Sequence, residues 1–446
     1  LAMIAAAATL YSDATTFPGA AALLPTLGAA LLLNAGHGGA QTSGAFRLLS
    51  TRPLVFVGKI SYSLYLVHWP LIVLVEYRQD ARLDLVQATI IIGLSIALAA
   101  LSWRFIEQPF RRPGHEALPR TRLFGRAAAA TALCCALGGG LVAANGWPGR
   151  LSPEVRAVYA MIRPEWKAED ACFVDTKGRT GPSLEDIRAG RLCSMSRTAV
   201  NERPKFLVWG DSHAPALAPG IFKAGDKLGL PGVLVGAGSC PPLEDFETLT
   251  ARPETRRRCH EVNEAAFDFL QRERVPLVFL VARWARAASG NGFGEEGMFF
   301  DPAKVPPPVP GEDARFAAAL DRTLARLMSY GVHPVVVLDV PEAGYAVAYA
   351  TAKAMMAGRD LSKITLTRRA ELERDGHATD IIEQIAAKYN APTVEPDPFF
   401  CNDDVCDLVR GGVPLYRDSD HITRTTALQL SDIFDSAFAS FVKASN

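Results

Sequence analysis

Two short polar segments hold the residues best suited to nucleophilic chemistry. The first, Gly210-Asp211-Ser212-His213, directly follows an apolar run of strand length. The second, Asp418-Ser419-Asp420-His421, lies near the end of the chain. A serine hydroxyl is a weak nucleophile and needs a neighbouring base. An imidazole oriented by a carboxylate is such a base, so we expect His421 to take the proton of Ser212 and Asp418 to orient His421.

Each of these residues also has an ordinary structural interpretation. A serine before a helix is commonly an N-cap, and a histidine there can be a surface residue. We expect Asp211 to make structural hydrogen bonds and His213 to shape the site. The combination favours catalysis, because a strand–GDSH–helix opening together with a terminal DxxH is far more specific than either part alone.

The sequence around the two segments predicts an α/β domain. Apolar runs of strand length lie at 205–210, 232–236, 277–282, 334–340 and, more weakly, 391–396. Helix-like stretches alternate with them, at 214–228, 257–273, 313–330, 376–389 and 423–443. This alternation indicates a parallel sheet with helices on both faces. The two long connections, 285–312 and 341–375, are of the kind that often builds a site.

The two polar segments resemble the motifs of the SGNH, or GDSL-like, hydrolase and acyltransferase superfamily. The resemblance covers residues 203–446 and implies a three-layer α/β/α domain with a five-stranded parallel sheet. It also implies a catalytic triad of Ser212, Asp418 and His421. In that superfamily the oxyanion is bound by the serine N–H, a glycine N–H of the second motif and an asparagine of the third.

The expected oxyanion donors are only partly present. Gly238, within GAGSCPP, occupies the second-motif position and is the expected partner of the Ser212 N–H. The third motif departs from the family, since Arg283-Trp284 stands where an asparagine is expected. Arg283 is a candidate third donor, although a salt-bridged or surface role is an equal interpretation. Two asparagines, one on an expected helix and one in a loop, fit poorly: Asn263 and Asn291.

Charged residues are distributed very unevenly along the 446-residue chain. The whole chain has 47 basic and 47 acidic residues, which argues against a nucleic-acid binder held by bulk charge. Residues 1–146 contain only 11 basic and 6 acidic residues, whereas residues 147–446 contain 36 and 41. The first third is therefore membrane-like, and the rest is expected to be a soluble domain.

Four apolar segments are long enough to span a bilayer, which takes about 20 residues: 18–36, 55–76, 85–103 and 127–146. Lys59 and His68 lie within the second, and polar groups inside a membrane are functional candidates. Because Leu1 already lies in apolar sequence, we expect a fragment whose upstream helices are missing.

The arginines of the loops predict the orientation of these segments. Arginine collects on the cytoplasmic side of membranes, and the loop between the last two segments is rich in it: Arg104, Arg111, Arg112, Arg120, Arg122 and Arg126. Only Arg78 and Arg82 fall on the opposite side. The last segment should therefore place residues 147–446 on the side of the membrane opposite the cytoplasm.

The cysteines fit an exported domain. Cys134 and Cys135 lie in the last apolar segment, and the other six of the 8 cysteines follow it. An even number in an exported domain suggests disulfides. Sequential pairing is the simplest of the fifteen arrangements: 172–193, 240–259 and 401–406. Zinc binding is the alternative, but no CxxC pair or clustered Cys/His spacing supports it, and we expect no metal.

The membrane-like part carries a second resemblance. The stretch Gly58–Pro70, GKISYSLYLVHWP, and Ile106–Arg111, IEQPFR, are similar to the late-helix motifs of the acyltransferase-3 membrane family. The order of the segments resembles that of fused bacterial O-acetyltransferases, which modify lipopolysaccharide O-antigen and related envelope glycans. The corresponding parts are 1–112 as late membrane helices, 123–146 as an extra transmembrane helix, 147–202 as a periplasmic linker and 203–446 as the SGNH-like catalytic domain.

This resemblance implies an acyltransferase of the bacterial inner membrane, with several spans and with residues 147–446 in the periplasm. Acetyl groups would pass from cytoplasmic acetyl-CoA through the membrane domain, and no cofactor would be bound in this chain. Ser212 would then place them on a sugar hydroxyl of an envelope glycan. An esterase with the same triad, which uses water as acceptor, stays open. A non-catalytic glycan-binding or structural module is the third alternative, favoured by the missing asparagine.

Overall fold

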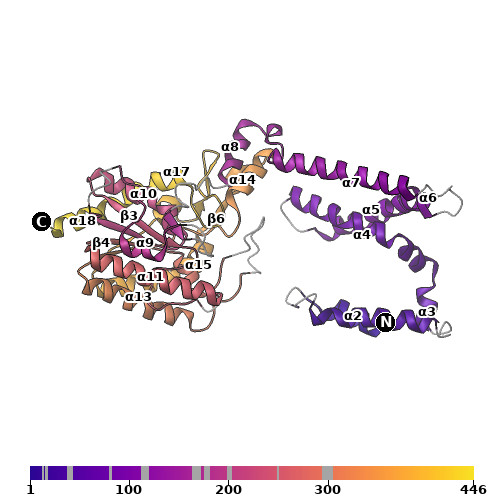
Figure 1. Cartoon of the computed structure of the whole chain (residues 1–446), viewed down its shortest axis with the longest axis horizontal. Coiled ribbons are helices and arrows are strands. Elements are labelled where there is room, and N and C mark those ends of the chain that lie inside the picture. Colours follow the sequence, from indigo (N-terminus) through magenta and orange to yellow (C-terminus); the bar gives the residue numbers. More distant parts are fainter. Residues whose placement is uncertain are drawn as a thin grey trace. The chain divides into compact units, whose positions relative to one another are not determined.

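The computed structural model describes most of the chain: residues 1–12, 15, 19–37, 44–79, 83–111, 120–162, 172–174, 181–197, 203–248, 251–293 and 305–445. The chain forms two compact units, Leu1–Cys135 and Ala136–Asn446. The described residues of the first unit form helices and no strand, and the second unit contains a sheet with helices (Figure 1). Arg82 and Arg112, used above to orient the membrane segments, lie outside the described residues.

Three helical segments among the described residues are long and apolar enough to cross a membrane. They are α4 (Arg52–Gln79), α5 (Leu85–Ser102) with the π-helical turn that extends it to Glu107, and Thr121–Ala143 of α7 (Arg120–Ala143). The expected span 18–36 is shorter, because its apolar helix covers only Ala20–Ala35. At 1.5 Å per residue that helix is about 24 Å long, less than the ~30 Å hydrocarbon core of a bilayer.

Helices α4 and α5 pack against each other along a narrow seam of buried residues: Ile60, Ser63, Ile91, Ser95 and Ala99. The Ser63 hydroxyl donates to Glu107 and lies 3.0 Å from the Ser102 hydroxyl. The two suspected polar residues of α4 have plainer surroundings. Lys59 is exposed, and His68 Nδ1 lies 3.0 Å from carbonyl oxygens of its own helix.

The second unit is built on a parallel sheet of six strands in the order β1-β3-β2-β4-β5-β7. The strands are β1 (Phe173–Val174), β2 (Phe206–Gly210), β3 (Gly232–Ala237), β4 (Leu277–Val281), β5 (His333–Val337) and β7 (Thr393–Val394). The prediction of five strands was wrong by one. The missed strand is β1, whose two residues are too few to give an alternating pattern, and which lies in the segment interpreted as a linker.

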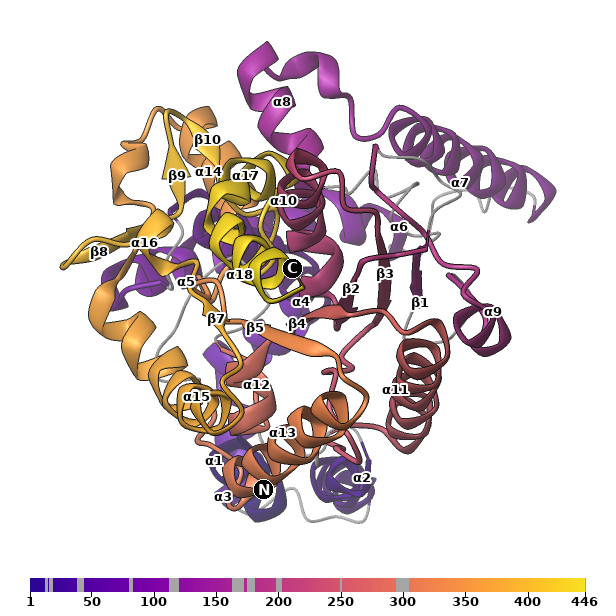
Figure 2. The ribbon, with the colours of Figure 1, turned by 90° about the vertical axis from the view of Figure 1, so that its left-hand side faces the viewer.

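Helices cover both faces of this sheet (Figure 2). On one face lie α11 (Pro253–Glu273), α13 (Glu312–Ser329) and α15 (Arg368–Lys388). On the other lie α10 (His213–Lys227), α17 (Arg424–Gln429) and α18 (Asp435–Ser445). Alternate residues of a strand point to opposite faces. Accordingly, Trp209 packs against Phe267 of α11, whereas Phe206 packs against Phe438 of α18. The expected three-layer arrangement is confirmed.

The long connections contain short elements of their own. Helix α12 (Trp284–Ser289) opens the first of them, and α14 (Val347–Met356) lies in the second. The expected helix 423–443 is three consecutive helical segments, with Leu430–Phe434 between α17 and α18. Helix α15 begins at Arg368, eight residues before the expected start at 376. Both connections leave the carboxyl ends of strands, where the site lies.

Three disulfides join Cys172 to Cys193, Cys240 to Cys259 and Cys401 to Cys406. The sequential pairing is therefore confirmed. Each bond closes a short loop, with sequence separations of 21, 19 and 5 residues. Cys134 and Cys135 are free and exposed on α7.

Candidate active site

Ser212 lies at the turn between strand β2 and helix α10. The strand ends at Gly210, whose backbone runs so close to β4 that a Cβ there would meet the Val281 carbonyl oxygen at 1.6 Å. Only glycine fits this approach. The Asp211 N–H then donates to the same carbonyl oxygen at 3.2 Å. This arrangement places Ser212 at the amino end of α10 and at the carboxyl edge of the sheet, where ligands of open parallel sheets bind.

Ser212, His421 and Asp418 form a continuous hydrogen-bonded chain. His421 Nε2 lies 2.7 Å from Ser212 Oγ, and His421 Nδ1 lies 3.0 and 2.9 Å from the two carboxylate oxygens of Asp418. The structure thus brings together three residues that are up to 209 positions apart in the sequence. Nucleophile, base and orienting carboxylate stand in the order that acyl transfer by a serine requires.

A tight turn fixes the carboxylate of this chain. Asp418 Oδ1 accepts the N–H groups of Asp420 at 3.1 Å and His421 at 2.7 Å. Arg417 Nε lies 3.4 Å from Asp418 Oδ2. Burial raises the pKa of Asp418, but the hydrogen bond and charge of His421 and the charge of Arg417 outweigh it, so the pKa lies well below its usual range. Asp418 is therefore a carboxylate at neutral pH and can hold the Nδ1 proton of His421.

His213 lies directly beside the imidazole of His421. The two rings stack, with centroids 4.7 Å apart and planes inclined by 21°. His213 is buried, its Nδ1 lies 3.3 Å from Asp211 Oδ1, and its Nε2 lies 3.7 Å from Asp420 Oδ2. Burial lowers the pKa of His213, but the hydrogen bond to Asp211 and the charges of Asp211 and Asp420 raise it to about 9. His213 is therefore an imidazolium at neutral pH.

Arg283 is a structural ion-pair centre rather than an exposed donor. It is buried, and Nε and Nη2 form a bidentate pair with Glu342 at 2.9 and 2.6 Å. Nη1 lies 2.9 Å from Asp420 Oδ2. All three guanidinium nitrogens are thus paired with carboxylates, which favours the salt-bridged role of Arg283 over the suggested oxyanion role.

Gly238 does not present a free donor either. Its N–H donates to the Val174 carbonyl oxygen at 3.0 Å, across the short strand that the sequence did not reveal. The two asparagines are also engaged elsewhere. Asn263 Nδ2 donates to the Pro241 and Leu243 carbonyl oxygens at 2.9 and 3.0 Å, and Asn291 Nδ2 donates to that of Pro307 at 2.7 Å. Of the expected donors, the Ser212 N–H is the one for which no acceptor occurs among the described residues.

Sequence reasoning missed the acidic residues behind the triad. Asp420 lies within the second motif itself, and its carboxylate links Arg283 to His213. Asp339, just after β5, accepts the N–H groups of Trp284 and Ala285 at 2.9 and 2.7 Å and so caps α12. The signal for Asp339 was available, since an acidic residue ends an apolar run at the carboxyl edge of the sheet.

One cluster at the site has the residue types of a metal centre. His213, Asp420 and His421 each have a ligand atom within 4.8 Å of the others. However, Asp420 is already paired with Arg283, and His421 uses both ring nitrogens within the triad. An arginine at 2.9 Å from the carboxylate opposes a divalent cation there. The donor set therefore fits a metal poorly.

Comparison with known proteins identifies the family of the chain. Residues 172–436, more than half of the chain, match the family described as SGNH domain (fused to AT3 domains). The chain belongs to this family.

Individual relatives cover smaller parts. O-acetyltransferase OatA of Staphylococcus aureus (strain NCTC 8325 / PS 47) is 43% identical over 72 residues, which are 16% of this chain and 12% of the relative. Among solved structures, the periplasmic domain of a lipopolysaccharide acetyltransferase from Salmonella ser. Paratyphi A has 13% identity and a TM-score of 0.44, covering 66% of this chain and 99% of that one. A carbohydrate esterase family 2 enzyme of Corynascus thermopiles has 12% identity and a TM-score of 0.32, covering 55% and 68%.

Proposed function

We propose that the protein transfers acetyl groups to hydroxyls of a cell-envelope polysaccharide, such as a lipopolysaccharide O-antigen, through an acyl-enzyme at Ser212. The single observation that carries this proposal is the hydrogen-bonded chain from Ser212 Oγ through His421 to Asp418. Membership in a family of SGNH domains fused to AT3 domains supports transfer over simple hydrolysis. The names of an O-acetyltransferase and a lipopolysaccharide acetyltransferase among the similar proteins point the same way.

The first half-reaction would acylate the serine. Ser212 Oγ attacks the carbonyl carbon of the acetyl donor while His421 Nε2 takes the hydroxyl proton, and Asp418 stabilises the imidazolium that forms. The tetrahedral intermediate then expels the donor's leaving group, which receives the proton from His421. Ser212 now carries the acetyl ester, and His421 is neutral again.

The negative oxygen of the intermediate would be held at the amino end of α10. Ser212 is the residue directly before the first turn of this helix, and a helix amino end favours negative charge. The Ser239 hydroxyl is the second donor that we propose. Ser239 follows β3 with a positive φ of 57°, a conformation that non-glycine residues adopt at a cost, and it lines the same cleft as Asp211, the residue before Ser212.

The second half-reaction would deliver the acetyl group. A sugar hydroxyl approaches the acyl-enzyme, His421 Nε2 removes its proton, and the oxygen attacks the ester carbonyl. Collapse of the second intermediate returns the proton to Ser212. The same steps with water give hydrolysis, so the acceptor decides between the two outcomes.

The acetyl donor and the location belong to the same proposal. Acetyl-CoA in the cytoplasm would supply the acetyl group through a membrane domain that includes residues 1–112, with 123–146 as a further span. Residues 147–446 would then work in the periplasm of a bacterium, attached to its inner membrane. Three helical segments apolar enough to cross a membrane support this location, as do three disulfides in the second unit.

The test uses the full chain in lipid nanodiscs with p-nitrophenyl acetate as donor. Envelope oligosaccharides are added, and mass spectrometry follows the gain of an acetyl mass on the sugar. We expect acetylated sugar with the wild type and with the surface control Ser362→Ala, and none with Ser212→Ala. We expect Ser239→Ala to lower turnover about 100-fold, as the loss of other oxyanion donors does. Acetate release at the same rate with every sugar, and no acetylated sugar, would instead identify an esterase.

A further inference from the structure

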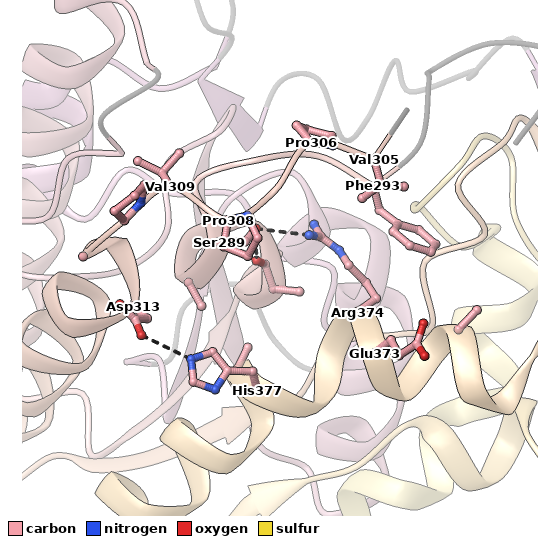
Figure 3. A pocket seen from close by; sticks show the side chains of 16 residues that line it. Ser289, Phe293, Val305, Pro306, Pro308, Val309, Asp313, Glu373, Arg374 and His377 are labelled. Carbon is pink, nitrogen blue, oxygen red and sulfur yellow. Dashed lines mark hydrogen bonds and ion pairs between the residues drawn. The ribbon is translucent and has the colours of Figure 1, made fainter. Parts of the chain in front are cut away.

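A second pocket opens beside the domain's proline-rich segment. It has a volume of about 590 Å³, within the usual range of small-molecule sites. One wall is formed by α12, another by the first half of α15, and the third by residues 305–311. Figure 3 shows Asp313 and His377 at one end, Phe293 toward the other, and Arg374 between them. Neither Ser212, Asp418 nor His421 lines this pocket.

The proline wall is held in place at two points. The Val309 N–H donates to the Ser289 carbonyl oxygen at 2.8 Å, and Asn291 Nδ2 donates to the Pro307 carbonyl oxygen at 2.7 Å. Proline fixes φ and so stiffens this segment further. The pocket is therefore largely preformed, and a ligand would lose little binding free energy in ordering its walls.

The chemistry of the lining favours a neutral polyol. Alanine, proline and valine side chains give the walls C–H surface, and Phe293 adds an aromatic ring. The two carboxylates at the rim accept hydrogen bonds but already have cationic or imidazole neighbours. Asp313 lies 3.4 Å from His377 Nε2, and Glu373 lies 2.7 Å from Arg369 Nε. The rim thus offers acceptors for hydroxyl groups without an unbalanced charge that would select an ion.

The pocket lies at the same edge of the sheet as Ser212. Helix α12 begins three residues after the last residue of β4. Helices α13 and α15 lead into β5 and β7, so both begin at the carboxyl edge of the sheet. An ion-pair chain joins the two sites. Arg374 donates to Glu342 at 3.0 Å, Glu342 pairs with Arg283, and Arg283 pairs with Asp420 of the second motif.

We infer that this pocket is a saccharide-binding site, which holds one part of a neutral polysaccharide while another part reaches Ser212. The inference rests on the proposed function for the identity of its ligand as the acceptor. A polymer held at two points of one edge gains affinity from the second contact, whereas a single sugar does not. Oligosaccharides should therefore bind more tightly than monosaccharides of the same type.

The experiment measures binding by calorimetry to the full chain in detergent, in a Ser212→Ala background that prevents turnover. The probes are malto-, manno-, cello- and chito-hexaose with their monosaccharides, and hexalysine and laurate as ligands of other chemistries. Ala370→Trp fills the pocket from α15, and we expect it to weaken binding of the preferred hexaose at least ~10-fold. Glu373→Gln, which keeps the size of the side chain, should weaken it about 3-fold. Glu383→Gln, an exposed position of the same helix, is the matched control and should change nothing.

Two results would overturn the inference: no binding of any neutral hexaose, or a hexaose affinity that is the same with and without both pocket substitutions. Binding of laurate or hexalysine that Ala370→Trp abolishes would assign the pocket to another ligand. Labelling of Ser212 by a fluorophosphonate in the otherwise unaltered chain reports separately on the proposed function. If Ser212 is labelled but the pocket substitutions leave hexaose binding unchanged, only the proposed saccharide site is contradicted. If Ser212 is not labelled but the pocket substitutions weaken hexaose binding, only the proposed enzymatic function is contradicted.

Discussion

The imidazole rings of His213 and His421 stack with their centroids 4.7 Å apart. His213 lies in the first turn of α10, directly after Ser212, and His421 lies in the second polar segment, so this ring contact depends on the positions of both segments. Asp211 contacts Nδ1 of His213, Asp420 contacts its Nε2, and Arg283 forms an ion pair with Asp420. We therefore expect His213 to position His421 within the proposed triad, in addition to filling space.

The raised pKa of His213 makes a prediction about stability and pH. In the folded chain this pKa is about 9, above the ordinary value of 6.5. A pKa raised by folding contributes stability that is fully present below pH 6.5 and is lost as the pH rises through about 9. We expect the melting temperature of the wild type to exceed that of His213→Gln at pH 6, and the difference to shrink by pH 10. Thermal scanning of both proteins across this range measures it, and a difference independent of pH would show that His213 is not charged.

Removal of the Arg283 guanidinium should cost more stability than any surface ion pair. Arg283→Met leaves Glu342 with Arg374 and Asp420 with His213 as their remaining cationic neighbours, and breaking a buried ion pair in this way typically costs about 3–5 kcal/mol. Arg369→Met removes a surface pair with Glu373 on α15 and should cost far less, because exposed ion pairs contribute little to stability. Denaturant titration of the two variants gives the comparison. Equal losses would mean that the Arg283 cluster is solvated in solution.

Asp418→Asn tests the orientation of the base. An asparagine keeps the shape of the side chain, but its amide does not require His421 to carry its proton on Nδ1. When the proton lies on Nε2 instead, that nitrogen cannot take the serine proton. In a serine protease triad the same change lowers kcat about 10⁴-fold, and we expect a loss on the order of 10³–10⁴ in p-nitrophenyl acetate turnover. The exposed Asp403→Asn should retain full activity. Turnover within tenfold of the wild type would remove Asp418 from the mechanism.

The cysteines give a simple chemical prediction. Three disulfides use six of the 8 cysteines, and Cys134 and Cys135 are free. Thiol titration of the unfolded, unreduced chain should therefore detect two thiols, and none in the variant with both replaced by serine. Thiols that persist in this variant would contradict the assigned disulfides.

The positions of the main strands, and the candidate roles of Ser212 and His421, could be proposed from the sequence because each depends on a short stretch of it. Ser212 follows a strand and His421 follows Asp418 by three residues, and local pattern suffices for both. The oxyanion donors could not be read in this way. Whether the Gly238 N–H is free depends on Val174, which belongs to a two-residue strand without periodicity. The role of Arg283 depends on Glu342 and Asp420, which only the folded chain brings near it.

The most direct measurement is a search for the acyl-enzyme itself. The full chain is mixed with p-nitrophenyl acetate, quenched in acid within a fraction of a second and digested, and the peptide that contains Ser212 is weighed and fragmented. We expect an acetyl mass on Ser212 that decays faster when an acceptor oligosaccharide is present and that is absent in His421→Ala. Product formation with an unmodified Ser212, or an acetyl group on another residue, would contradict the account.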